Sequence, residues 1–398
     1  MCAARKAINV SRYNQLCCQS SPWQTMTGEP MAESINMAAV DRMAAARAAK
    51  AAGRAVVAVV GPGVPIELVL ACGAMPVRIV ADAGGATPAA DDLVGTAESA
   101  EMRALIEQAL GGGLAFADLL VITRPHEWLY YYLKEAVRLG AEGVPPLHMH
   151  DLVPSAEASL RAYNRQRLER LAEAVARAIG VVPTSAALER AIAVANRRRA
   201  ALRDVQRRRD AGLLGGADAV AMIAASHVLG PETFADQAEA WVEGLSPPSG
   251  PRLLLLASDP AEDGALHRAI EAAGVVVVAE DSEWGARAAT PDIAAGDDPL
   301  DALLDDLHAI ACGPDVSPRS ARLAWAEAAM ARDDIAGVVF AVPPGDRRFG
   351  WDYPGLRDRA AGLGLPQLLL RDDPRADPAS VTAAVAGFVA TLGREAAA

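Results

Sequence analysis

The stretch "GPGVPIELVLACGAMPVRI" occupies residues 61–79 and follows the uniformly apolar run "AVVAVV" at residues 55–60. That run is too short for a helix and too apolar for a half-exposed strand, so it predicts a strand buried in a parallel sheet. Pro65 suits the first turn of a following helix, and Gly73 ends that helix. "MPVRIV" then predicts a second strand. This strand–helix–strand series favours an α/β fold.

The alternation continues along the first part of the chain. Strands are predicted at residues 118–123 and 146–150, and helices at 37–53, 98–110 and 127–139. From residue 157 to about residue 243 the apolar residues recur at three- and four-residue spacing with no strand signal, and Thr184 or Ser185 supplies an N-cap. This segment predicts a group of helices.

A second α/β series follows the turn-rich "SPPSGP" at residues 246–251. Its predicted strands are 252–258, 275–281, 337–342 and 366–373, and its predicted helices are 261–274, 299–312, 319–333, 354–363 and one at the C-terminus. We therefore expect two Rossmann-like or flavodoxin-like parallel-sheet domains with an intervening helical segment. The expected boundaries are a disordered tail at 1–36, α/β domain 1 at 37–156, a helical linker domain at 157–248 and α/β domain 2 at 249–398.

Composition limits the classes of function. The chain has 398 residues and a formal net charge of -12, which argues against non-specific nucleic-acid binding. No apolar run approaches the roughly 18 residues of a membrane span. The first 36 residues contain no continuous apolar segment before a cleavage-like site, so we expect no secretory signal, and Met31 or Met37 is an alternative start. The five cysteines form no disulfide framework, and a cytoplasmic location is expected.

Three blocks in a fixed order carry a family resemblance. They are "VPIELVLACGAMPVRI" (64–79), "LLLLASDPAEDGALHRAIEAAGVVVVAED" (253–281) followed by Gly285 and Arg287, and "IAGVVFAV" leading to "GLPQLLLRDD". Together they resemble the cluster-carrying subunits of the 2-hydroxyacyl-CoA dehydratase component D and benzoyl-CoA reductase family, over roughly residues 38–395. Asn196 with Arg198 or Arg199 also fits that family's pattern.

The resemblance implies an unusual chemistry. Subunits of this family pair with a paralogous subunit, bind an acyl-CoA and each hold a four-iron, four-sulfur cluster, and an ATP-dependent activator supplies a low-potential electron. Removing water from a 2-hydroxyacyl thioester requires loss of a β-proton that is hardly acidic. One-electron reduction acidifies that proton, and an iron with an open site binds the leaving hydroxyl.

The chain departs from the family at the cluster ligands. The places where the resemblance puts thiolates are occupied by Gly61, by His126 followed by Glu127, and by Gly345 or Asp346. Iron–sulfur clusters are held by cysteine thiolates. Cys72 falls in a helix body and Cys312 follows an amphipathic helix, so both are interpreted as small buried hydrophobes. We therefore expect no cofactor on this chain and the cluster on a partner.

"RPHEWLYYYLKE" at residues 124–135 supplies the catalytic candidates, His126 and Glu127, as acid and base. In one alternative they join Glu283 and Asp346 as ligands of a divalent iron. In another, His126 caps the helix while the neighbouring aromatic side chains cover a sheet edge or a partner interface. Those aromatic residues are Trp128, Tyr131 and Tyr132.

Substrate contacts are expected where parallel strands end, because ligands lie beyond the carboxyl ends of such sheets. The candidates are Gly61, Pro62, Gly63, Glu67, Asp281, Glu283, Arg287 and Asp346. Arg78, Arg287, Arg347 and Arg348 are cationic candidates for CoA phosphates. Arg287 pairing with a local carboxylate, Glu67 capping a helix, and a solvated Asp281 are the structural alternatives. His148 and His150 are expected on one face of a strand, buried or facing a partner rather than binding zinc.

The leading functional hypothesis is a diverged subunit of a 2-hydroxyacyl-CoA dehydratase or benzoyl-CoA reductase type complex. It would bind acyl-CoA and pair with a cluster-bearing paralogue. The alternatives are a non-catalytic scaffold or regulatory paralogue, and a redirected enzyme that uses His126 and carboxylates.

Overall fold

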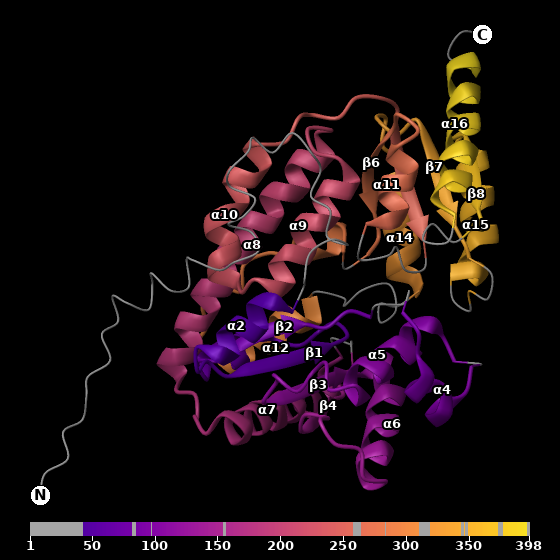
Figure 1. Ribbon diagram of the computed structural model, residues 1–398. Coiled ribbons are helices and arrows are strands. Elements are labelled where there is room, and N and C mark those ends of the chain that lie inside the picture. Colours follow the sequence, from indigo (N-terminus) through magenta and orange to yellow (C-terminus); the bar gives the residue numbers. More distant parts are fainter. Residues whose placement is uncertain are drawn as a thin grey trace, which may run out of the picture.

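The structure is a computed structural model that describes residues 43–81, 85–96, 98–153, 157–257, 264–282, 284–309, 319–343, 346, 349–372 and 377–395. The expected N-terminal tail lies outside these residues. Two separate parallel sheets form the framework, and Figure 1 shows one below the other, in the indigo-to-magenta and the orange-to-yellow parts of the chain. The prediction of an α/β fold with two parallel sheets is confirmed.

The first sheet has four parallel strands in the order β2-β1-β3-β4. The strands are β1 (Val56–Val60), β2 (Met75–Arg78), β3 (Leu119–Thr123) and β4 (Leu147–His150). Every residue of β1 and β3 is buried, as expected for central strands that are apolar except for Thr123 at the end of β3. The helices of this part are α2 (Ala44–Ala51), α3 (Ile66–Ala71), α4 (Pro88–Val94), α5 (Ala100–Leu110), η3 (Arg124–His126) and α6 (Glu127–Arg138).

The second sheet repeats the strand order of the first, as β6-β5-β7-β8. Its strands are β5 (Arg252–Ala257), β6 (Val276–Glu280), β7 (Gly337–Ala341) and β8 (Gln367–Leu370). One face packs on α11 (Ala265–Glu271) and α16 (Pro378–Glu395), and the other on α14 (Arg319–Met330) and α15 (Phe349–Gly362). Each sheet is thus the middle of a three-layer sandwich.

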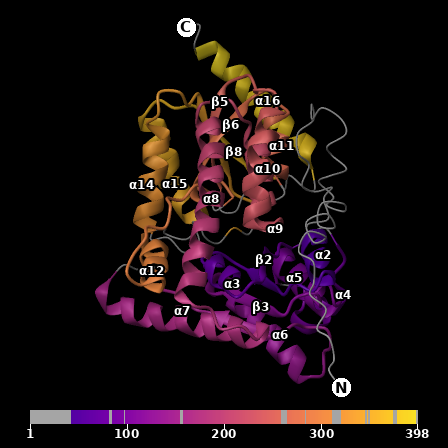
Figure 2. The ribbon, with the colours of Figure 1, turned by 90° about the vertical axis from the view of Figure 1, so that its left-hand side faces the viewer.

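Four helices lie between the two sheets in the chain: α7 (Ala158–Ile179), α8 (Ser185–Asp210), α9 (Gly216–Val228) and α10 (Pro231–Glu243). The predicted N-cap of α8 is confirmed, since the Thr184 side chain accepts a hydrogen bond from the Ala187 backbone N–H at 3.2 Å. Helix α8 contacts α3 near one end and β6 near the other, so a single rigid element touches both α/β parts (Figure 2).

The helical segment and α12 (Pro299–Ala309) share cores with the first sheet. Helices α8, α9 and α10 contribute apolar side chains to the core on one face of this sheet. On the opposite face, Leu303, Leu304 and Leu307 of α12 pack with α3 and α7. Among the described residues no helix combines the length and apolarity needed to cross a membrane.

Candidate functional site

The site is built around the loop that follows β1. Gly61 and Gly63 both have positive φ, at 90° and 78°, a conformation that side chains with a Cβ resist. A Cβ atom on Gly61 would lie 1.9 Å from Thr123 Oγ1 and 2.9 Å from His126 Nδ1. Gly61 therefore lets the end of β1 approach the end of β3 closely, and this turns the loop toward α3, which begins after Pro65.

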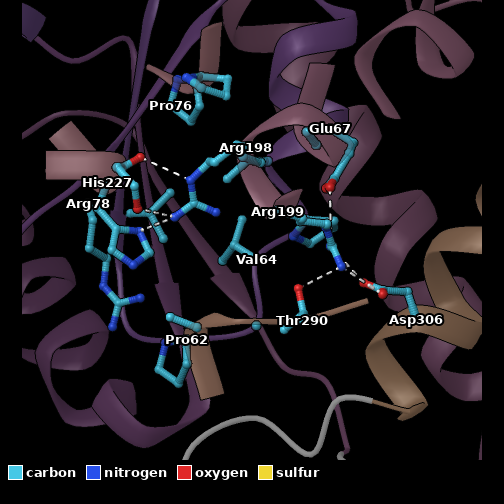
Figure 3. A pocket seen from close by; sticks show the side chains of 18 of the residues that line it. Pro62, Val64, Glu67, Pro76, Arg78, Arg198, Arg199, His227, Thr290 and Asp306 are labelled. Atoms are coloured by element: carbon cyan, nitrogen blue, oxygen red, sulfur yellow. Dashed lines mark hydrogen bonds and ion pairs between the residues drawn. The ribbon is translucent and has the colours of Figure 1, made fainter. Parts of the chain in front are cut away.

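A cavity of about 180 Å³ lies beside this loop. Its walls come from the loop itself, the start of α3, the end of β2, helices α8 and α9, and the segment from η4 (Ala286–Ala288) to α12. Figure 3 shows Val64 near its centre, with Pro62 and Pro76 on opposite sides and arginine side chains between them. The cavity therefore lies at the carboxyl edge of the first sheet, where the sequence predicts ligand contacts.

One wall is held by a buried ion-pair network around Arg199. Its guanidinium binds Asp306 through two 2.9 Å hydrogen bonds and lies 3.4 Å from Glu67 Oε1. It also donates to Thr290 Oγ1 at 3.0 Å (Figure 3). Burial raises the pKa of Glu67, and Arg199 only partly opposes that effect. The network joins α3, α8 and α12, so Glu67 is part of a clamp at the cavity wall.

The neighbouring Arg198 has different partners. It donates to the Ser226 backbone carbonyl at 3.1 Å and to the Ser226 hydroxyl at 2.7 Å. Its Nη2 also lies 3.3 Å from His227 Nδ1. Burial and the adjacent Arg199 lower the pKa of Arg198 to about 10, which still leaves it charged at neutral pH.

His227 lies between two guanidinium groups. Burial, Arg198 and Arg78 lower the pKa of His227 well below its ordinary value, so its imidazole is neutral at pH 7. The rings of His227 and Trp284 meet edge to face with centroids 4.9 Å apart. The Arg78 guanidinium lies 5.7 Å from the same Trp284 ring. The part of the cavity wall around His227 is therefore cationic and partly apolar.

Of the catalytic candidates, His126 lies near Gly61, and neither His126 nor Glu127 is among the residues that line this cavity. His126 is the N-cap residue of α6, the position that one alternative gave it, but its side chain makes no capping hydrogen bond among the described residues. Its Nε2 lies 3.4 Å from Glu101 Oε1, and its buried Nδ1 has no hydrogen-bond partner among the described residues. Glu127 instead interacts electrostatically with Arg124. The carboxylate beside His126 is therefore Glu101, which the sequence did not reveal.

The aromatic residues of α6 divide between surface and interior contacts. Trp128 and Tyr131 are 60% and 54% exposed, whereas Tyr132 donates a hydrogen bond to Glu98 at 3.1 Å. On β4, His150 is buried, and burial together with His148 lowers the pKa of His150 to about 4.

The remaining sequence candidates lie in the second α/β part. Asp281 accepts two hydrogen bonds from Arg287, at 2.5 and 3.3 Å, so Arg287 lines the cavity while paired with a local carboxylate. Asp346 accepts a hydrogen bond from the Gly350 N–H at 2.7 Å and is not part of the cavity lining. Glu283, Cys312, Gly345, Arg347 and Arg348 lie outside the described residues.

The residues present do not fit a thiolate-bound cluster at this edge. Two of the three places where the resemblance puts thiolates, Gly61 and His126, are in contact in the structure, and neither supplies sulfur. Cys72 is the one cysteine in the described part of the chain; it is 3% exposed and burial raises the pKa of its thiol. Within that same part no three His, Cys, Asp or Glu side chains are grouped as metal ligands would be.

Fold and site define a two-domain α/β protein with a cavity of about 180 Å³ at the carboxyl edge of its first parallel sheet. The chain belongs to the family described as 2-hydroxyglutaryl-CoA dehydratase, D-component, whose model matches residues 63–389. The family predicted from the sequence motifs is thereby confirmed. No individual curated protein matches the chain.

Several residues of the cavity wall were not predicted as site residues. Arg198 and Arg199 fit the family pattern in the sequence, but nothing indicated that they face the loop after β1. Ser226, His227, Thr290 and Asp306 had no signal at all. Their contribution depends on how α9 and α12 pack against the first sheet, which local sequence patterns do not specify.

Proposed function

We propose that this chain is a diverged subunit of a 2-hydroxyacyl-CoA dehydratase or benzoyl-CoA reductase type complex. It binds the acyl end of an acyl-CoA and pairs with a paralogous subunit that carries the iron–sulfur cluster. The observation that carries the proposal is the cavity beside residues 61–67, which combines apolar side chains with guanidinium groups. Apolar walls with a few placed polar groups are typical of ligand pockets.

The size of the cavity defines which part of an acyl-CoA it takes. Pockets that enclose drug-sized ligands occupy roughly 300–1,000 Å³, whereas this cavity has about 180 Å³. It therefore suits the acyl group and thioester, and the nucleotide end of CoA extends beyond it. Arg78 and Arg287 line the same cavity and are the cations proposed to contact the phosphates of CoA.

The residues at the expected cluster-ligand positions of the first sheet indicate which subunit holds the cluster. Because Gly61 and His126 provide no thiolate, the proposal assigns the cluster and its electron chemistry to the partner subunit, together with an ATP-dependent activator. This chain contributes substrate binding and an interface. In this proposal no residue of this chain binds the iron.

Calorimetry with acyl-CoAs tests the substrate-binding part of the proposal. We expect measurable binding of aliphatic or aromatic acyl-CoAs by the full chain, lost in Val64→Phe, which fills the cavity beside the loop. Val137→Phe is the matched control because Val137 is 46% exposed on α6. Flat heats across both ligand types would contradict acyl-CoA binding.

Co-purification separates the alternatives. A cysteine-bearing paralogue that co-purifies with this chain, together with acyl-CoA binding, supports the proposal. The same partner without any acyl-CoA binding supports a scaffold or regulatory subunit. A redirected enzyme at His126 would instead turn over an acyl-CoA without a partner and lose that activity in His126→Gln.

A further inference from the structure

Arg198 differs from Arg199 and Arg287, which also line the cavity, in the charge of its partners. Arg199 is paired with Asp306 and Arg287 with Asp281. The hydrogen-bond partners of Arg198 are a carbonyl, a hydroxyl and an imidazole, all uncharged. Within the described part of the chain its Nη1 has no hydrogen-bond partner, and in Figure 3 this nitrogen is directed toward the cavity.

The guanidinium of Arg198 is held in one orientation. The Ser226 hydroxyl that accepts from Nη2 itself donates to the Ile223 carbonyl at 2.6 Å, so its lone pairs face Arg198. His227 Nδ1 accepts from the same nitrogen, which places the imidazole proton on Nε2. Two edges of the guanidinium are therefore fixed by α9, and the third edge remains for a ligand.

The charge of Arg198 is not balanced by the groups that hold it. Ser226 and the neutral His227 orient Arg198 without neutralising it, and Arg78 adds a second guanidinium on the other side of His227 (Figure 3). A desolvated charge without a counter-ion is costly, and the cost is recovered when an anion binds. Glu67 is the acidic group that acts on Arg198, but its carboxylate contacts Arg199.

We propose that Arg198 is the recognition group for a compact oxyanion, a carboxylate or a phosphate oxygen, inside the cavity. Nη1 would donate a charge-assisted hydrogen bond to the ligand, with Ser226 and His227 as the residues that position Arg198. The inference rests on the proposed function for the location of the site and deepens it, because it makes charge on the ligand a determinant of specificity. The anionic group has two sources, a carboxylate at the far end of the acyl chain or a phosphate of CoA.

Two pairs of probes and two free anions distinguish these sources by calorimetry on the full chain. Glutaryl-CoA against pentanoyl-CoA tests a terminal carboxylate, CoA against 3′-dephospho-CoA tests a phosphate, and free glutarate and inorganic phosphate test the isolated anion. Each is measured with wild type, Arg198→Gln and Arg197→Gln. Arg197 is the adjacent residue of α8, 56% exposed and paired with Asp236, so it is a matched loss of one surface charge.

We expect the member of one pair that carries the additional carboxylate or phosphate to bind wild type about tenfold or more tightly than the member that lacks it, as a charge-assisted hydrogen bond requires. Arg198→Gln should reduce that ratio to below about threefold, and Arg197→Gln should leave it unchanged. A ratio near one in wild type for every pair overturns the inference, as does a preference that persists in Arg198→Gln. Both wild-type comparisons hold even if Arg198→Gln fails to fold, and circular dichroism identifies that case.

The failure of this inference and that of the proposed function are distinguishable. If pentanoyl-CoA binds and neither pair shows a preference for the member with the additional anionic group, acyl-CoA binding stands and the oxyanion site is wrong. If no CoA ester binds but glutarate or phosphate binds in an Arg198-dependent manner, the oxyanion site stands and acyl-CoA binding is wrong. Absence of binding for every probe contradicts both.

Discussion

Replacing Gly61 by alanine tests the geometry on which the site depends. Two costs follow from the structure: a residue with a Cβ at φ 90°, and a Cβ placed 1.9 Å from Thr123 Oγ1 and 2.9 Å from His126 Nδ1. A left-handed conformation costs about 1–2 kcal/mol, and overpacking a buried contact about 1–3 kcal/mol. We therefore expect Gly61→Ala to lower the free energy of unfolding by about 2–5 kcal/mol.

Urea denaturation followed by circular dichroism measures this change, and Gly73→Ala is the control. Gly73 has a φ of 78°, but a Cβ added there would meet no atom of the described residues within 4 Å, so only the conformational cost of about 1–2 kcal/mol applies. In Gly61→Ala/Thr123→Ala the removal of Oγ1 should restore part of the lost stability. Equal destabilisation by Gly61→Ala and Gly73→Ala would refute the close approach of β1 and β3.

Three further predictions concern buried groups. Glu280→Gln should destabilise the protein by about 3–5 kcal/mol because it leaves Arg209 without its counter-ion. Burial of Glu280 would raise its pKa, but Arg209 outweighs this effect and holds the pKa of Glu280 at about 2. The stability that this carboxylate contributes to the wild type is therefore complete above pH 4.5 and is lost as the pH falls toward 2. Burial raises the pKa of Glu67, so the folded state keeps a proton that the unfolded state releases; wild type should lose stability relative to Glu67→Gln as the pH rises above 4.5, measured by urea titration at a series of pH values. Cys72 should resist iodoacetamide in the native protein and react after unfolding, as peptide mass mapping would show, and rapid native labelling would contradict its burial.

Local sequence patterns specified most of the framework. The runs at 55–60, 118–123 and 337–342 predicted strands, the first of them as a buried strand, and all three lie in the middle of parallel sheets. Helix α4 was missed because it is only seven residues long and has little apolar periodicity. Helix α15 begins at Phe349, before the expected residue 354, because Pro354 falls inside it rather than at its start.

The site was less predictable because it depends on contacts between distant segments. The sequence identified the loop at Gly61 and the position of His126, and the structure brings these two together. It did not indicate that Glu101 contacts His126, or that Ser226 orients Arg198 across 28 positions of the chain. Such pairings depend on how α5, α8 and α9 pack. The spacing of apolar residues predicts which face of a helix is buried, but it does not predict which element that face contacts.

We propose that this family member binds substrate while a partner holds the cluster. Iron and acid-labile sulfide should be quantified in the full chain after purification alone under strictly anaerobic conditions. We expect iron and sulfide far below one per chain. About four of each per chain, the content of a complete cluster, would contradict the claim and require sulfur ligands other than the residues at the edge of the first sheet.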